Sequence, residues 1–363
     1  MASVIAVISV ALAVSGLGAA VRTSAHAAQV QALASASVSS AGGRGLLPAL
    51  PPHPARAASA TVPKVSPPVP AVAAAPAAAP SAPSGPIPVA QVALPLVDTS
   101  RKAGSGPRVL TTSVWYPAAA GSPDNVAAPA ASGGPFPLIV FAHGYNVTPA
   151  AYAGLLRSWA RAGYVVAAPT FPLTNPGAPG GPDEGDVVNQ PADVRFVIDQ
   201  LLWADAKPGL LGGLIDPHKI AVAGHSDGAI TAAEVAYNTC CRDTRISAAI
   251  VMAGAAIGVP GGSYFPPASA PMLAVQGGAD HSNNPQNSLG LYTGDGGGPK
   301  YLLDLPGASH EGPFMDGGRA ADVVHQATID FLGRYLKGGS TSQLLHDGSV
   351  PGVASIAAPL GQS

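Results

Sequence analysis

The 363-residue chain contains few charged side chains, few aromatic residues and only two cysteines. Charged residues make up 10% of the sequence, aromatic residues 5%, and the formal net charge is −2. A weakly acidic chain without basic clusters is a poor partner for nucleic acid, because binding to phosphates depends on lysine and arginine. Two cysteines exclude a disulfide-rich scaffold, and no spacing of cysteine and histidine indicates a zinc site.

Acidic residues are missing from the first quarter of the chain. No aspartate or glutamate precedes Asp98, and the first 97 residues hold four basic side chains. The remainder holds 14 basic and 20 acidic side chains, which leaves a balance of −6. This change in charge predicts that a folded domain begins at about residue 95 and follows an N-terminal segment of different character.

Residues 1–27 have the pattern of a secretory signal peptide. Residues 1–21 carry no charged side chain and include an apolar run at 4–14. The small-x-small sequence Ala25-His26-Ala27 follows, and we expect cleavage after Ala27. Because no lysine or arginine precedes the apolar run, an uncleaved membrane anchor stays open as the alternative. Both alternatives predict a protein that is secreted or associated with the cell envelope.

Residues 28–94 are rich in alanine, proline and serine. Fourteen prolines fall within the 48 positions 48–95, against 25 in the other 315 positions. Such a segment has too few large apolar side chains to offset the entropy cost of ordering it. We therefore predict a disordered spacer, either a cell-wall tether or a featureless leader.

Residues 95–338 alternate between segments typical of strands and segments typical of helices. Apolar or β-branched runs predict strands at 109–116, 136–142, 164–168, 219–223, 248–252, 272–276 and 300–305. Apolar positions at helical spacing predict helices at 150–162, 191–203, 229–237 and 320–336. This alternation predicts a single α/β domain with a mostly parallel sheet and helices on both faces. Residues 339–363 are predicted to form a C-terminal tail.

The pentapeptide Gly224-His225-Ser226-Asp227-Gly228 has the form G-x-S-x-G and occurs once in the chain. A predicted strand runs directly into it and a predicted helix leaves it, which is the context of a nucleophile elbow. The serine on such a turn has a strained backbone, and the flanking glycines let neighbouring chain approach. We therefore predict Ser226 as a nucleophile, with a purely structural glycine turn as the alternative.

A serine nucleophile needs a histidine that accepts its proton. His310 follows the predicted strand at 300–305 in a loop, whereas His325 lies in the last predicted helix and His346 in the tail. Catalytic groups gather in loops that follow sheet strands. His310 is therefore the predicted base.

The carboxylate that orients this histidine should also follow a strand. Asp280 follows the predicted strand at 272–276, whereas Asp295 lies in a glycine-rich turn and Asp304 within a strand. Asp280 is therefore the predicted acid. The chain order Ser226, Asp280, His310 is that of the α/β-hydrolase sheet and differs from the chymotrypsin and subtilisin orders.

Backbone amides must stabilise the oxyanion of a tetrahedral intermediate. One predicted donor is the N–H of Asp227, directly after the nucleophile. The other lies in the loop after the strand at 136–142, where Tyr145 is the first choice and Gly144 the second. An ordinary turn at the strand end is the alternative.

The stretch 246–279 contains no charged residue across 34 positions. Most of it is assigned to two core strands, but Tyr264 and Phe265 lie between these strands. We expect the two side chains to face the substrate, with core packing as the alternative. Cys240 and Cys241 are adjacent, and both a pair of buried thiols and a strained vicinal disulfide stay open.

These segments together resemble secreted bacterial α/β-hydrolases of the dienelactone-hydrolase-like and platelet-activating-factor-acetylhydrolase-like group, related to polyester hydrolases and cutinase-like lipases. The matching segments are 114–117, 143–145, 163–166, 224–228, 278–280 and His310. The resemblance implies a serine carboxylic-ester hydrolase without metal or organic cofactor, with Ser226, Asp280 and His310 as its triad. Serine stands where dienelactone hydrolases have cysteine, and Asp227 stands where polyester hydrolases usually have methionine.

The sequence therefore predicts an esterase or lipase-like enzyme that forms an acyl-enzyme with a small-molecule or lipid ester. We expect a monomer that binds no nucleic acid. Two alternatives are an acyltransferase of the cell envelope that uses the same residues, and a non-catalytic binding module of the same fold.

Overall fold

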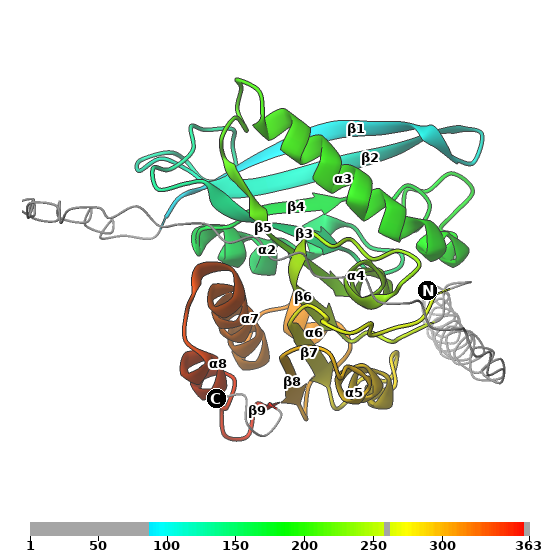
Figure 1. The fold of residues 1–363 in the computed structure, drawn as a ribbon, viewed down its shortest axis with the longest axis vertical. Coiled ribbons are helices and arrows are strands. Elements are labelled where there is room, and N and C mark those ends of the chain that lie inside the picture. Colours follow the sequence, from blue (N-terminus) through cyan, green and yellow to red (C-terminus); the bar gives the residue numbers. More distant parts are fainter. Residues whose placement is uncertain (1–86, 258–261, 359–363) are drawn as a thin grey trace, which may run out of the picture.

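The computed structural model describes residues 87–257 and 262–358, and a nine-stranded sheet forms its centre (Figure 1). In sheet order the strands are β1 (Val89–Ala103), β2 (Gly106–Pro117), β4 (Val165–Pro169), β3 (Phe136–Ala142), β5 (Ile215–His225), β6 (Ile246–Met252), β7 (Met272–Gly277), β8 (Lys300–Leu305) and β9 (Ser355–Ala357). The strands from β4 to β8 in this order pair in parallel. The pairs β1–β2, β2–β4 and β8–β9 are antiparallel. The prediction of a mostly parallel sheet is confirmed.

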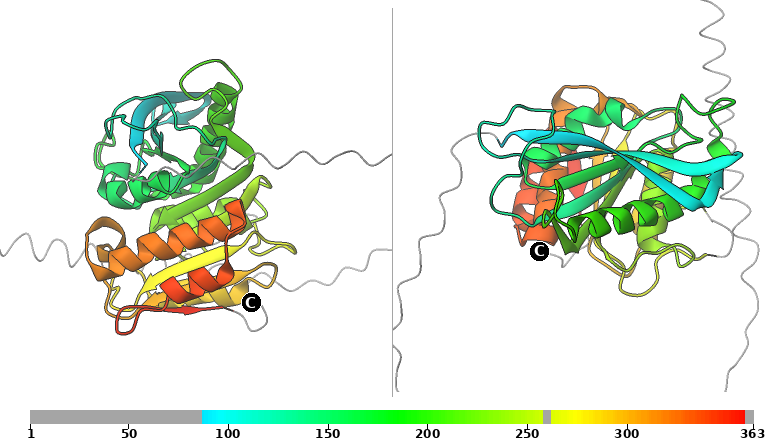
Figure 2. Two further views of the ribbon diagram at one scale, coloured as in Figure 1. Left: turned by 90° about the vertical axis from the view of Figure 1, so that its left-hand side faces the viewer. Right: turned by 90° about the horizontal axis from the view of Figure 1, so that it is seen from above.

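Helices cover both faces of the sheet (Figure 2). One face carries α3 (Gln190–Asp205), α4 (Asp227–Tyr237) and α5 (Pro285–Gly294). The other carries α2 (Ala153–Arg161), α6 (Gly312–Met315), α7 (Arg319–Lys337) and α8 (Thr341–Asp347). Two 3-10 segments, η1 (Pro149–Tyr152) and η2 (Glu184–Asn189), lead into α2 and α3.

The alternation of side chains along each central strand explains the two helical layers. Leu138 and Val140 of β3 belong to the apolar cluster under α3 and α4, whereas Ile139 and Phe141 belong to the cluster under α2 and α7. Successive strand residues point to opposite faces, so a continuous apolar run is buried on both sides. This is why the run at 136–142 identified its strand from sequence.

The folded unit is longer at both ends than predicted, and the boundaries at 95 and 338 lie inside it. β1 starts at Val89, within the predicted spacer, and its register with β2 begins at the pair Val89–Pro117. Leu344 of α8 is buried, and β9 pairs with β8, so most of the predicted tail is part of the fold. β1 escaped prediction because it is a half-exposed edge strand that contains Pro95, a residue tolerated at sheet edges.

The predicted signal peptide or anchor and most of the predicted spacer lie outside the described residues. Within residues 87–257 and 262–358, no helix is long and apolar enough to cross a membrane. Cys240 and Cys241 are joined by a disulfide bond just after α4. Of the two alternatives for these cysteines, the structure therefore shows the vicinal disulfide and not the pair of thiols.

A buried ion-pair network attaches the long connection between β4 and α3 to the sheet. Arg108 of β2 is 1% exposed and donates hydrogen bonds to both Asp186 of η2 and Asp193 of α3. Arg101 adds a second ion pair to Asp193 at 2.7 Å. Removing one member of such a network leaves buried charge without compensation, which costs more than an exposed pair contributes.

We therefore expect Arg108→Met to lower the free energy of unfolding by about 3–5 kcal/mol, because Asp186 and Asp193 lose their main buried partner. Arg161→Met is the matched control, since it breaks a largely exposed pair with Asp124 and should cost at most about 1 kcal/mol. Urea unfolding followed by tryptophan fluorescence measures both values. Equal losses in the two variants would contradict the structural role of the network.

Candidate active site

Ser226 occupies the sharp turn between β5 and α4, because β5 ends at His225 and α4 begins at Asp227. Its backbone angles are φ 55° and ψ −123°, a region that non-glycine residues rarely adopt. Its N–H donates to the carbonyl of Met252 at 3.0 Å, which ties the turn to the end of β6. The residue is partly exposed, whereas both of its neighbours are buried.

The glycines of the pentapeptide allow backbones to meet under this turn. A Cβ atom on Gly224 would lie 2.0 Å from the carbonyl oxygen of Gly228. A Cβ atom on Gly228 would lie 2.0 Å from the carbonyl oxygen of Ala142, the last residue of β3. Gly144 also lies against the nucleophile, since its Cβ would be 3.2 Å from that of Ser226. The loop after β3 therefore borders Ser226 directly.

His310 and Asp280, the base and the acid that the sequence predicts, lie within hydrogen-bond distance of each other. The distance between His310 Nδ1 and Asp280 Oδ2 is 2.7 Å. The Asp280 side chain has no exposed surface, and that of His310 is 13% exposed. Because an ionised carboxylate only accepts hydrogen bonds, Nδ1 carries the hydrogen and Nε2 is left as a proton acceptor.

Asp280 is held as an anion by hydrogen bonds to both of its oxygens. The N–H groups of Ser282 and Asn283 donate to Oδ1 at 2.8 Å each, and Gln276 Nε2 donates to Oδ2 at 3.1 Å. Burial opposes ionisation, but the hydrogen bonds from His310, Asn283 and Ser282 outweigh it and keep the pKa of Asp280 below its ordinary value. A charged Asp280 fixes both the orientation and the tautomer of His310.

Tyr145 and Asp227 are the two oxyanion donors that the sequence predicts, and both lie next to residues at the turn of Ser226. Tyr145 follows Gly144, which lies against Ser226. Asp227 is the first residue of α4 and directly follows Ser226. Gly144, the second choice, directs its N–H to the hydroxyl of Tyr152 at 3.2 Å instead.

Two fully buried histidines near the serine escaped the sequence analysis. His143 Nδ1 lies 2.8 Å from the carbonyl of Gly144, and its Nε2 accepts the N–H of Phe171 at 3.0 Å. His225 lies 2.8 Å from the Tyr152 hydroxyl through Nδ1 and 2.9 Å from the His310 carbonyl through Nε2. The only signal in the sequence was their position, next to the oxyanion loop and within the pentapeptide.

Burial keeps both histidines neutral. It lowers the pKa of His143 to about 4. Burial, together with the nearby His310, lowers the pKa of His225 to about 3. Neither imidazole therefore carries charge at neutral pH, and each acts as one hydrogen-bond donor and one acceptor.

The two predicted substrate contacts, Tyr264 and Phe265, lie side by side with ring centroids 5.7 Å apart. Phe265 packs on Tyr237 with ring centroids 5.5 Å apart, at the C-terminal end of α4. Ser226 precedes the other end of this 11-residue helix, which is about 16 Å long. The structure therefore does not bring Phe265 to the serine. Tyr264 donates its hydroxyl to the carbonyl of Ile257 at 2.9 Å.

Ile257 belongs to a small apolar cluster that is separate from the two main cores. Ile230 and Ala255 complete this cluster. Ile230 lies one helical turn beyond Ser226, so the cluster begins close to the nucleophile. Residues 258–261, which continue from Ile257, lie outside the described residues.

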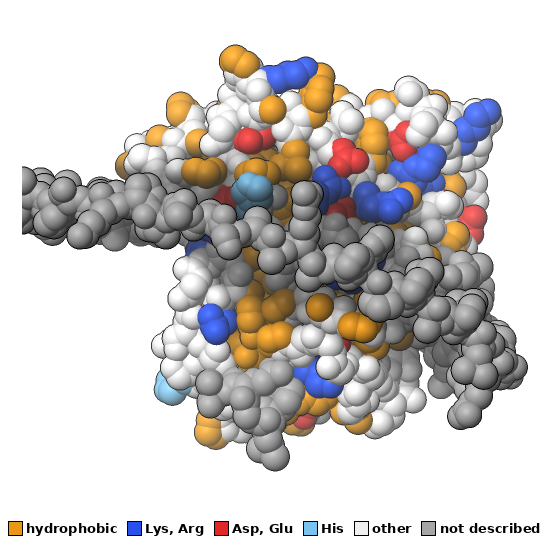
Figure 3. All heavy atoms as spheres, in the orientation of Figure 1, with side chains coloured by type: hydrophobic (Ala, Val, Ile, Leu, Met, Phe, Trp, Pro, Cys, Tyr) orange, Lys and Arg blue, Asp and Glu red, His pale blue; other side chains and the backbone are white. Residues whose placement is uncertain are grey.

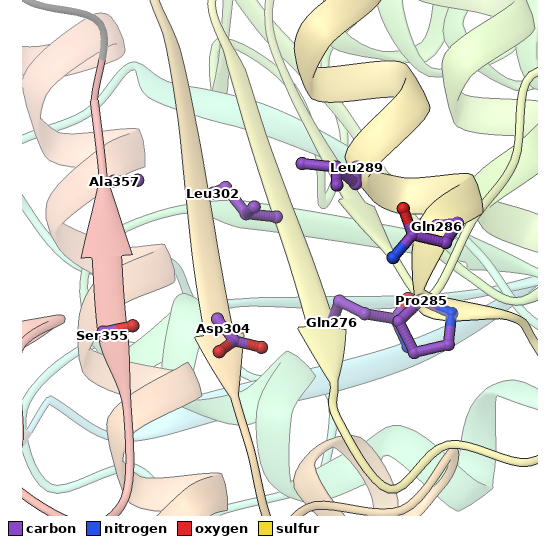
Figure 4. A pocket seen from close by; sticks show the side chains of 8 residues that line it. All are labelled: Gln276, Pro285, Gln286, Leu289, Leu302, Asp304, Ser355 and Ala357. Atoms are coloured by element: carbon purple, nitrogen blue, oxygen red, sulfur yellow. The ribbon is translucent and has the colours of Figure 1, made fainter.

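A groove of about 300 Å³ opens on the α5 side of β7, β8 and β9 (Figure 4). It is lined by Gln276, Pro285, Gln286, Leu289, Leu302, Asp304, Ser355 and Ala357. The lining does not include Ser226, Asp280 or His310. Gln276 lines the groove and also donates a hydrogen bond to Asp280. The groove is therefore separate from the acid–base pair and the serine.

The described residues show neither a metal cluster nor a single-sign surface on the face drawn in Figure 3. In residues 87–257 and 262–358, no three histidine, cysteine, aspartate or glutamate side chains are grouped to hold a metal ion. On the face in Figure 3, basic and acidic side chains are interspersed. One groove on α3 is lined by three arginines, Arg101, Arg195 and Arg245, together with Asp199.

Comparisons with known proteins agree with this architecture. The family model described as chlorophyllase matches residues 109–262, from β2 to the segment after β6. Among solved structures, the chain is similar to the ferulic acid esterase from Streptomyces cinnamoneus. The identity is 24%, the match covers 77% of this chain and 98% of that chain, and the TM-score is 0.59. No curated protein matches the chain.

The fold is that of the α/β-hydrolases, as predicted.

The buried neutral histidines predict that stability falls on acidification. In the unfolded chain their pKa is about 6.5, so between about pH 6 and pH 4 the unfolded state binds more protons than the folded state. Each histidine then lowers the free energy of unfolding by up to about 1.4 kcal/mol per pH unit as the pH falls. We expect His143→Gln to reduce this slope, and the exposed His281→Gln to leave it unchanged, in urea unfolding from pH 4.5 to 8. Identical slopes for wild type and His143→Gln would contradict the conclusion that His143 is neutral in the folded protein.

Proposed function

We propose that the protein is a serine carboxylic-ester hydrolase that acts through Ser226, His310 and Asp280. The proposal is carried by one arrangement: a strained serine on an elbow beside an oriented His310–Asp280 pair. These residues follow β5, β8 and β7, so all three belong to the carboxyl edge of the parallel strands. The 2.9 Å contact between His225 Nε2 and the His310 carbonyl brings the elbow and the base loop together.

In the proposed reaction, Ser226 Oγ attacks the ester carbonyl while His310 Nε2 accepts the hydroxyl proton. The tetrahedral intermediate collapses, and His310 returns the proton to the leaving alcohol, which leaves an acyl group on Ser226. Water then attacks the acyl-enzyme with His310 again as the base, and the carboxylic acid is released. Asp280 stays ionised throughout and stabilises the imidazolium form of His310.

The oxyanion is proposed to bind the backbone N–H groups of Tyr145 and Asp227. The position of Asp227 at the start of α4 places the positive end of a helix dipole beside the developing charge. Loss of one such donor costs about 3–4 kcal/mol of transition-state stabilisation in comparable enzymes.

The substrate class proposed is a small-molecule or lipid ester with an apolar or aromatic acyl group. The cluster of Ile230, Ala255 and Ile257, with the Tyr264 hydroxyl bound to it, supplies an apolar wall near the nucleophile. The name of the similar solved structure, a ferulic acid esterase, is compatible with this class. From the N-terminal sequence we further propose that the protein is secreted or associated with the cell envelope. We also propose that it is a monomer.

Labelling with a fluorophosphonate probe tests the nucleophile. We expect the wild-type protein to be labelled and Ser226→Ala to lose all labelling, because the probe reacts only with an activated serine. Ser247→Ala at the start of β6 is the control and should keep full labelling. Labelling that survives in Ser226→Ala would overturn the proposed function.

Kinetics with p-nitrophenyl esters of two to sixteen acyl carbons test the acid. Asp280→Asn should lower kcat by about 10⁴-fold, because an amide no longer fixes the productive tautomer of His310. Asp304→Asn is the matched control, since Asp304 lies on the neighbouring strand β8 and lines the separate groove. It should keep kcat within about twofold of wild type. A similar loss in both variants would argue against Asp280 as the acid.

A further inference from the structure

Three hydrogen bonds in series connect the oxyanion loop to the base loop through the elbow. The N–H of Gly144 donates to Tyr152 Oη at 3.2 Å, and Tyr152 Oη lies 2.8 Å from His225 Nδ1. His225 Nε2 lies 2.9 Å from the carbonyl oxygen of His310. The chain of bonds therefore starts beside the proposed oxyanion donor Tyr145 and ends on the backbone of the proposed base.

The direction of each bond follows from chemistry. A carbonyl oxygen only accepts, so His225 Nε2 must carry the ring hydrogen. In the neutral ring Nδ1 then has a lone pair, and the Tyr152 hydroxyl donates its single hydrogen to it. The lone pairs of Tyr152 Oη are left to accept the N–H of Gly144. Each hydrogen bond in the series therefore has one possible assignment of donor and acceptor.

Aromatic rings pack against the two side chains of the series. Tyr152 has no exposed surface and His225 is 1% exposed. The His225 ring lies 4.6 Å from that of His310 and 4.7 Å from that of Phe314 in α6. Tyr152 packs on Phe141 of β3 at 4.7 Å. In such an enclosed place water does not replace a lost bond, so the removal of one partner leaves a buried polar group unsatisfied.

We propose that Tyr152 and His225 form a positioning bridge that holds the oxyanion loop and the base loop in register with Ser226. The inference rests on the proposed function and deepens it. His225 directly precedes Ser226, and a Cβ on Gly144 would lie 3.2 Å from that of Ser226, so a shift at either end of the bridge moves a loop relative to Ser226. The polar atoms of both side chains bond to each other and to backbone groups of Gly144 and His310. Both are positioning residues, and their effect appears in the chemical step.

A histidine suits this position because it combines two hydrogen-bonding nitrogens with a flat ring. The bridge requires an acceptor facing Tyr152 and a donor facing the His310 carbonyl, on a flat group that fits between the rings of His310 and Phe314. Glutamine also offers one acceptor and one donor, although its amide is smaller and lacks the ring. Phenylalanine keeps the ring but removes both polar atoms. The two substitutions therefore separate hydrogen bonding from packing.

The first test is Tyr152→Phe, which keeps the buried ring and removes the bridging hydroxyl. We expect kcat for p-nitrophenyl esters to fall about 10- to 100-fold, because the displaced oxyanion loop stabilises the transition state less well. KM should change less than about threefold. Tyr116→Phe is the control, since it removes another buried hydroxyl, bound to the Ala128 carbonyl. It should keep wild-type kcat.

The second test compares His225→Gln with His225→Phe and combines the latter with Tyr152→Phe. Glutamine should retain more of kcat than phenylalanine, and the double variant should be no slower than the slower single variant. Wild-type kcat in a folded Tyr152→Phe, or independent multiplication of the two losses, would overturn the bridge. Either result leaves the proposed function intact, because that function fails only if Ser226→Ala keeps its labelling and activity.

Discussion

The close contact of three backbone segments under Ser226 is the constraint on which the rest of the site depends. Gly224, Gly228 and Ala142 come so near one another that no side chain fits between β5, α4 and β3. The contact holds the serine in a backbone conformation that costs about 1–3 kcal/mol, and the packed sheet around it offsets that cost. The same contact sets the distance between Ser226 and the loop after β3. It therefore determines both the strained backbone of Ser226 and the position of this loop.

A second feature is that three buried polar side chains near Ser226 have hydrogen-bond partners for their polar atoms. Asp280 accepts hydrogen bonds on both oxygens, while His143 and His225 are neutral and have a partner on each nitrogen. In a region of low dielectric, unsatisfied groups are costly, so such networks specify one arrangement. The site is therefore rigid through its polar groups as well as through its apolar packing.

The sequence predicted those features that depend on short segments. The apolar run at 136–142 identified β3, and the strand–turn–helix context of Ser226 was visible beside the motif. The positions of Asp280 and His310 followed from the rule that functional groups lie after strands. The contact of Tyr152 with His225 was not predictable, because it joins residues 73 positions apart through the tertiary fold. Phe265 was misplaced for the same reason, since its packing on Tyr237 depends on where α4 ends.

The register of β1 gives the domain a defined orientation. Val89 pairs with Pro117 of β2, whereas Thr112, five residues earlier in β2, already pairs with Pro169 at the carboxyl end of β4. The start of β1 therefore lies toward the amino ends of the parallel strands, and Ser226 follows a carboxyl end. The chain therefore enters the domain on the side of the sheet opposite to the carboxyl ends that Ser226, Asp280 and His310 follow.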